Sequence, residues 1–387
     1  MFSKRTEWNL ETNRFSAALE RLRCEGKSLL DLTVSNPTTS GFKSDEGKIL
    51  QSLAEGTALQ YSPEPRGLRS AREAVRGYYA TLPCAASVAN EQIFLTTSTS
   101  EGYSYAFRLL CNPGEEVLVP RPGYPLFEFL ATIQDVSLAS YPLIYDHGWH
   151  LDWYSLESMI NERTRAVVVV HPNNPTGSFV QPGERERLGE LCAKHGLAII
   201  ADEVFLDYRF GPAVASFVDH QQCLTFTLSG LSKVCGLPQM KVAWMVVSGP
   251  APAQKEAISR LEIIADTYLS LNTPVQAAMP ELLNMRHRFQ EQLNSRLRNN
   301  LDELDRRLQS SASCRRLEVV GGWYATLRVP ATQSDEDLAI SLMEKHGVIV
   351  HPGHFFDFPA DGYLVVSLMT PEEDFREGIK RVLGITG

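Results

Sequence analysis

The sequence contains few cysteines and shows no pattern among them. The seven cysteines of the 387-residue chain lie far apart, and no two of them form a CxxC pair. Such scattering is typical of neither a disulfide framework nor a zinc site. We therefore expect no metal centre, and free thiols in a reducing compartment such as the cytoplasm.

Long apolar runs and clusters of positive charge are also missing. No stretch approaches the roughly 18 uninterrupted apolar residues that a membrane helix needs. The first residues, MFSKRTEWNLETNRFS, lack the apolar core of a signal peptide. The formal net charge is -9, whereas binding to nucleic acid depends on clustered lysines and arginines. We expect neither a membrane span nor a nucleic-acid partner.

Short apolar runs that alternate with amphipathic stretches fill the chain between about residues 91 and 244. This alternation predicts an α/β architecture. The runs RAVVVVH (165–171) and LAIIADE (197–203) are continuously apolar, as in strands of a parallel sheet that is covered on both faces. We therefore predict a mostly parallel sheet flanked by helices.

Chain length and a change of pattern after residue 250 predict two domains, because 387 residues exceed one ordinary core. We expect long helical segments at 250–268 and about 275–310. The pattern of the remaining residues, 314–387, predicts the order strand, strand, helix, strand, strand, helix. We assign residues 40–285 to a large domain, and residues 1–39 with 286–387 to a smaller α/β domain.

Two residues with reactive side chains follow predicted strands, where ligands bind in open α/β sheets. Asp202 ends the run LAIIAD, and Lys233 lies in the turn SGLSKVCGLP after the apolar strand CLTFTL. Separately, a helix cap explains Asp202 and a solvated side chain explains Lys233. Together they suit pyridoxal 5'-phosphate (PLP), which needs an amine for attachment and an acid that keeps its pyridine nitrogen protonated.

Three further segments offer the remaining groups that this cofactor needs. Ser98, Thr99 and Ser100 begin a predicted helix, where hydroxyls and free N–H groups can bind a phosphate. Asn174 lies in the turn HPNNPTGSF, and Tyr124 of PRPGYP can cover a ring. Capping, turn formation or packing explains each segment alone.

Seven segments together resemble the class I/II aminotransferases, the fold-type-I PLP enzymes. They occur in the family's order over nearly the whole chain, as YSPEPRGLRSAREAV, STSEGYSYAF, NPGEEVLVPRPGYP, HPNNPTG, ADEVF, SGLSKVCGLP and GGWYATLRV. The resemblance implies the fold-type-I architecture, PLP as cofactor, and an amino acid and a 2-oxo acid as substrates.

The resemblance also implies roles for single residues. Lys233 matches the lysine that binds the cofactor as a Schiff base, Asp202 the partner of the pyridine nitrogen, and Asn174 the donor to the phenolic oxygen. Tyr124 matches the aromatic side chain that stacks on the ring. In Phe205 the chain departs from the family's tyrosine, and losing that hydroxyl should raise the pKa of the imine.

The phosphate site combines matches and departures. Residues 98–100 match the phosphate loop, and Tyr61 matches the tyrosine that reaches the neighbouring subunit's phosphate, which implies a homodimer with shared sites. Lys241 stands where an arginine is expected, so a point charge replaces a guanidinium fork. Gly230 stands where the family often has a serine. A cationic group remains, and we expect phosphate binding to remain.

The most consequential departure concerns the substrate. Val365 in YLVVSLMT stands where an arginine usually holds the substrate's α-carboxylate. Either the substrate lacks a carboxylate at that position, or another cation takes the role. The candidates are Arg14, Arg66, Arg121 and Arg328.

We predict a PLP-dependent aminotransferase that acts by a ping-pong mechanism. The alternative is a lyase, cyclase or oxidase on the same scaffold, which product analysis with and without a 2-oxo acid would distinguish. A regulatory protein with an aminotransferase-like body is disfavoured, because Lys233 and Asp202 are both present and no basic module accompanies them. The amino donor stays open.

Overall fold

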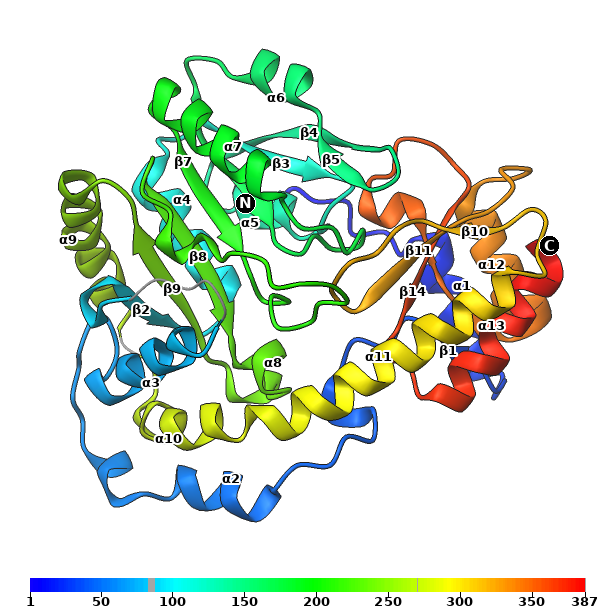
Figure 1. Cartoon of the computed structure of the whole chain (residues 1–387), viewed down its shortest axis with the longest axis horizontal. Coiled ribbons are helices and arrows are strands. Elements are labelled where there is room, and N and C mark those ends of the chain that lie inside the picture. Colours follow the sequence, from blue (N-terminus) through cyan, green and yellow to red (C-terminus); the bar gives the residue numbers. More distant parts are fainter. Residues whose placement is uncertain (83–87, 270, 387) are drawn as a thin grey trace.

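The structure is a computed structural model that describes residues 1–82, 88–269 and 271–386. Its centre is an eight-stranded sheet with helices on both faces (Figure 1). The strands, in their order across the sheet, are β2 Ile93–Thr96, β9 Ala243–Ser248, β8 Thr225–Gly230, β7 Ala198–Asp202, β6 Thr164–Val170, β3 Glu116–Arg121, β4 Ser137–Tyr145 and β5 Trp149–Leu151.

Five adjacent strands of this sheet, β8, β7, β6, β3 and β4, run parallel, while β2, β9 and β5 pair antiparallel to their neighbours. The apolar runs expected at 165–171 and 197–203 are β6 and β7, and every residue of β7 is buried. The predicted α/β class with a mostly parallel sheet is confirmed.

Alternating side chains of each strand enter two different cores, because successive residues of a strand point to opposite faces. On β6, Val168 and Val170 pack with α4 and α9, whereas Val167 and Val169 pack with α6 and α7. The helices of this part are α2 Glu46–Leu53, α3 Arg69–Ala80, α4 Thr99–Leu110, α5 Phe127–Thr132, α6 Trp153–Met159, α7 Pro182–His195, α8 Leu231–Val234, α9 Ala251–Tyr268 and α10 Thr273–Asn284.

A further core surrounds two small sheets at the other end of the molecule (Figure 1). One is the parallel pair β1 Leu30–Asp31 and β12 Val348–Ile349. The other is antiparallel, with the order β10 Arg315–Arg316, β11 Tyr324–Arg328, β14 Tyr363–Ser367 and β13 His351–Pro352. Its helices are α1 Arg14–Cys24, α12 Asp335–His346 and α13 Glu372–Thr386.

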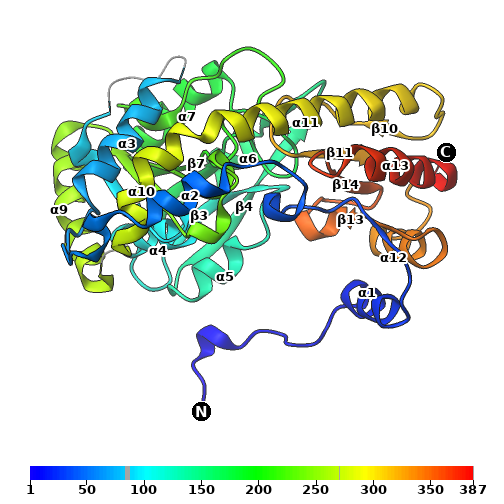
Figure 2. The ribbon, with the colours of Figure 1, turned by 90° about the horizontal axis from the view of Figure 1, so that it is seen from below.

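The helix α11 Arg286–Leu308 runs from the large sheet's helices to the core around the small sheets, as Figures 1 and 2 both show. The helical stretch expected at about 275–310 is therefore two helices, since α10 ends at Asn284 and α11 begins at Arg286. Among the described residues, no helix is long and apolar enough to cross a membrane.

Candidate functional site

A cavity of about 310 Å³ lies where β6, β7 and β8 end and α4 begins. Parallel strands bring their carboxyl ends to one edge of a sheet, so residues far apart in the chain meet there. Most of the expected site residues line this cavity, namely Ser98, Thr99, Tyr124, Asn174, Asp202, Phe205 and Lys233.

Lys233 lies on the short helix α8 that directly follows β8. Burial lowers the pKa of its amine to about 8, and the negative charge of Asp202 opposes this shift. Tyr208, which is buried, donates a hydrogen bond of 2.5 Å from its hydroxyl to the backbone carbonyl of Lys233. The backbone is therefore anchored while the amine faces the cavity.

Asp202 is the last residue of β7, and its carboxylate is buried beside the same cavity. It accepts hydrogen bonds from the Val204 backbone N–H (3.1 Å) and the Tyr103 hydroxyl (3.0 Å). Burial raises the pKa of Asp202 to about 6, although both hydrogen bonds and the Lys233 charge lower it. An acid held in this way suits a cationic ring nitrogen, because a nearby positive charge would stabilise the carboxylate form that burial disfavours.

Asn174 follows β6 in a loop whose shape is fixed by its neighbours. The Asn173 amide donates to the Pro122 carbonyl (3.1 Å) and to Thr176 Oγ1 (2.9 Å). Asn174 Oδ1 is buried and has no hydrogen-bond partner among the described residues. The side chain is thus held at the cavity wall with hydrogen-bonding capacity left for a ligand.

The N-terminus of α4 forms the polar end of the cavity. Ser98 caps the helix, because its hydroxyl accepts a hydrogen bond from the Glu101 N–H (3.2 Å). Ser98 and Thr99 line the cavity together with Ser232, which follows β8. Helix N-termini attract anions through free N–H groups and the helix dipole. A phosphate fits here, and a cofactor with a phosphate, a cationic ring and an aldehyde fits the whole cavity.

Three expected residues lie outside the cavity. Ser100 is one position further along α4 and does not reach the lining. Lys241 has a left-handed backbone (φ 52°) after the turn 238–240, and its side chain is exposed. Tyr61 has a largely exposed side chain (79%) on a loop before α3.

Gly230 has no room for the serine that the family often carries there. A Cβ on Gly230 would come within 2.9 Å of the Ala243 Cβ and 3.0 Å of the Val242 carbonyl oxygen. Since β8 pairs with β9 at this point, Gly230 opposite Ala243, the two strands pack closely. The hydroxyl of Ser232, two residues later, lines the cavity instead.

Val365 is fully buried in β14, between Thr326 of β11 and His351 of β13 in the sheet register. These three side chains share one face of the sheet, because paired residues of antiparallel strands point the same way. Tyr324, two residues before Thr326, is on that face too and lines the cavity. Val365 itself is packed in the hydrophobic core and does not line the cavity, so this position offers no charge to the site.

None of the four arginine candidates lines this cavity, and each has other partners in the structure. Arg14 pairs with Glu336 and Asp337, and Arg66 pairs with Glu262. The other two donate to backbone carbonyls, Arg121 to that of Asp357 and Arg328 to that of Asp361. Among the described residues that line the cavity, Lys233 is the only cation.

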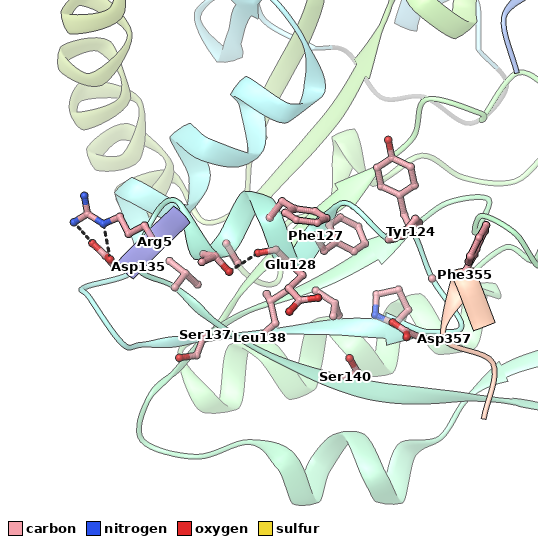
Figure 3. A pocket seen from close by; sticks show the side chains of 18 of the residues that line it. Arg5, Tyr124, Phe127, Glu128, Asp135, Ser137, Leu138, Ser140, Phe355 and Asp357 are labelled. Carbon is pink, nitrogen blue, oxygen red and sulfur yellow. Dashed lines mark hydrogen bonds and ion pairs between the residues drawn. The ribbon is translucent and has the colours of Figure 1, made fainter. Parts of the chain in front are cut away.

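Sequence reasoning missed two residues that reach the cavity from the region of the small sheets, which are Ser35 and Tyr324. The segment GGWYATLRV indicates the family, but nothing in its sequence indicates that one of its residues contacts Lys233. Tyr124 also lines a larger, more open cavity of about 1150 Å³ (Figure 3). In that view Tyr124 and Phe355 lie at one end, while Arg5 is paired with Asp135 at the other. The small cavity thus adjoins open space at Tyr124.

The fold and the site together define a PLP-dependent enzyme of the fold-type-I architecture. The family model "Aminotransferase class I and II" matches residues 27–382, and the chain belongs to this family. It is 28% identical to an alanine aminotransferase of Mycobacterium tuberculosis, over 94% of this chain and 86% of that protein. It is 30% identical to the glutamate-pyruvate aminotransferase AlaA of Escherichia coli, over 68% and 65% respectively.

Solved structures share the fold. An alanine aminotransferase from Pyrococcus furiosus superimposes with a TM-score of 0.89 at 21% identity, covering 100% of this chain and 99% of that one. A Thermus thermophilus aspartate aminotransferase mutant superimposes with a TM-score of 0.85 at 24% identity, covering 100% of this chain and 99% of that one. The chain is therefore a PLP-dependent aminotransferase, and the predicted family, cofactor and amino-group transfer are confirmed.

Proposed function

We propose that Lys233 is the residue that binds the cofactor covalently and then serves as the catalytic base. The observation that carries this proposal is the pairing of a half-buried amine with a buried acid, Asp202, in one cavity at the carboxyl edge of the sheet. A lysine whose pKa lies near 8 is partly unprotonated at neutral pH, as a nucleophile and base must be.

The other site residues have positioning roles in this proposal. Asp202 would pair with the pyridine nitrogen, Asn174 would bind the phenolic oxygen, and Tyr124 would lie over the ring. Ser98 and Thr99, with Ser232, would hold the phosphate at the start of α4. When bound, the cofactor supplies an electron sink for the bond that breaks at the substrate's Cα. The free amine of Lys233 takes the proton from that carbon.

We propose that the donor is a small 2-amino acid such as alanine or glutamate and that pyruvate is an acceptor. The names of the relatives from Mycobacterium and Escherichia coli support this choice. The carboxylate of the donor would meet no guanidinium from β14, since Val365 replaces it. Ser35 and Tyr324 line the cavity, and their hydroxyl groups can donate to a carboxylate.

We further propose a homodimer, a two-domain chain and a cytoplasmic location. Residues 40–285 contain the eight-stranded sheet, while 1–39 and 286–387 contain the two smaller sheets. The exposed Tyr61 and its apolar neighbour Leu59 suit a contact with a second subunit. Free thiols are present at Cys24, Cys111, Cys192, Cys223 and Cys235, as a reducing compartment keeps them.

The test of the reaction is a product analysis of the PLP-loaded protein with alanine, with and without a 2-oxo acid acceptor. A transaminase produces one equivalent of pyruvate per site without acceptor, and continuous turnover only when acceptor is added. Continuous release of ammonia or of a decarboxylated product without acceptor would instead establish the lyase or oxidase alternative.

A further inference from the structure

Lys233 is surrounded by aromatic rings, and none of its contacts in the structure is a hydrogen bond from Nζ to another described residue. Its ammonium nitrogen lies 4.6 Å from the centre of the Trp323 ring and 5.7 Å from that of the Phe205 ring. Cations within about 6 Å of an aromatic face are attracted by the ring's quadrupole. Both rings lie within this distance.

The Trp323 ring is held by packing. Its edge contacts are the ring of Phe205, at 5.2 Å between centroids and 65°, and the ring of Tyr208, at 5.3 Å and 70°. Trp323 is 1% exposed, and its indole N–H has no hydrogen-bond partner among the described residues. Since Tyr208 also donates to the Lys233 carbonyl, one aromatic cluster fixes both the backbone and the amine of this lysine.

We propose that Trp323 is a positioning residue for the reaction, whose indole face, together with the ring of Phe205, holds the ammonium group of Lys233 whenever that amine is free. This inference rests on the proposed role of Lys233 as the reactive amine. The lysine is free before the cofactor binds, and again in each turnover after the substrate amine has displaced it. In that interval the amine takes up a proton, and a buried ammonium needs a partner.

The rings of Trp323 and Phe205, here called the cage, compensate for the tyrosine hydroxyl that the family has at the position of Phe205. Phe205 offers an aromatic face but no hydrogen bond, and Asp202 is the charged group that acts on the amine. Burial alone lowers the affinity of the amine for a proton. The attraction of the rings acts in the opposite direction, together with Asp202, and keeps the amine able to accept the proton from the substrate.

The test is the pKa of Lys233 in the full-length, cofactor-free protein, measured by competitive acetylation with acetic anhydride over a range of pH and mass spectrometry of the Lys233 peptide. In Trp323→Leu, we expect the pKa to fall by about half a unit to one unit, because the cation loses its main ring. Trp323→Phe, which keeps a ring, should restore most of the difference, and Phe205→Leu should give a smaller fall because its ring is more distant.

A merely structural role of Trp323 predicts the opposite sign. Loosened packing would admit water around Lys233, and the pKa would then rise toward the 10.5 of a solvated lysine. The matched control is Trp149→Leu, which removes an equally large side chain from the same core without touching Lys233. The pKa of Lys233 in Trp149→Leu should equal the pKa of Lys233 in the wild type. An unchanged or raised pKa in Trp323→Leu would overturn the proposal.

The PLP-loaded enzyme provides a second readout. Trp323→Leu should lower kcat by at most about three- to tenfold, because a weaker base takes the proton from the substrate more slowly and the rate changes by no more than the base strength does, while KM changes less than kcat. Failure of this inference and failure of the proposed function are distinguishable. If Lys233 is not the attachment residue, Lys233→Ala retains covalently bound PLP, whereas the acetylation measurement reports on the cage in either case.

Discussion

Buried ionisable groups dominate the site at the scale of single residues. Their types could be predicted from the sequence, because Asp202 and Lys233 each follow an apolar strand, and parallel strands end at a common edge. Their environment could not. The ring of Trp323 lies 90 residues from Lys233 in the chain and that of Phe205 lies 28 residues from it, and no local pattern encodes contacts between such distant segments.

Asp202 should lower the stability of the cofactor-free protein at neutral pH. Its pKa in the folded protein is raised from 3.8 to about 6, so folding favours the protonated form. The associated stability is fully present below pH 3.8 and is lost as pH rises through 6. In Asp202→Asn, which carries no charge at any pH, we expect the free energy of unfolding at pH 7 to rise by about 1–3 kcal/mol.

This gain in the free energy of unfolding is partly offset, because the Lys233 ammonium group loses its attraction to the charge of Asp202. Urea unfolding of both proteins at pH 4 and pH 7 measures the effect. The difference between them should be small at pH 4 and develop by pH 7, and the variant should also lose its affinity for PLP. A difference that is the same at both pH values would show that Asp202 is not a buried, titrating acid.

Loops between strands and helices determine the site at the scale of elements. Motif reasoning found the loop 173–177 and the start of α4, because turn and capping residues act locally. It placed Ser100 and Lys241 with the cofactor residues, whereas neither lines the cavity. One step along a helix rotates a side chain by about 100°, and the left-handed backbone of Lys241 redirects its side chain. Short motifs do not specify in which direction a single side chain points.

Gly177 should be indispensable to the loop that presents Asn174. Its backbone has φ 67°, and a Cβ there would lie 2.2 Å from Val319 Cγ2 and 2.5 Å from the Gly321 carbonyl oxygen. In Gly177→Ala, we expect a loss of at least about 1–3 kcal/mol in the free energy of unfolding, and weaker PLP binding because the loop shifts.

The matched control for this prediction is Gly183→Ala. Gly183 lies in α7, and a Cβ there would meet nothing within 4 Å. This variant should be slightly more stable than the wild type, by about 0.5–1 kcal/mol, because alanine favours the helix. Thermal unfolding of both variants, with a PLP titration, compares them. Equal stability of the two would contradict the role given to the loop.

At the scale of the whole molecule, chain length and the change of pattern after residue 250 predict two domains, but they do not indicate that the region of the smaller sheets contributes residues to the cavity. Tyr324 reaches the cavity from β11, which follows α11, whereas Ser35 reaches it from the segment that follows β1. The sequence resemblance supplies the remaining expectation at this scale, a homodimer in which Tyr61 serves the neighbouring site.

Complementation between two inactive variants tests this shared site. We expect Lys233→Ala and Tyr61→Ala each to lose most of their activity. After mixing, unfolding and refolding, heterodimers contain one site with a native Lys233 from one subunit and a native Tyr61 from the other. Activity should therefore partly recover. Each variant refolded alone provides the control, and no recovery in a mixture shown to contain heterodimers would contradict the shared site.

The attachment of PLP to Lys233 is the central claim, and peptide mapping tests it most directly. The protein would be loaded with PLP, reduced with sodium borohydride, digested and analysed by mass spectrometry. We predict a pyridoxyl phosphate adduct on the peptide that contains Lys233, and its disappearance in Lys233→Ala. An adduct mainly on another lysine, or an unmodified Lys233 in protein that retains PLP, would contradict the account.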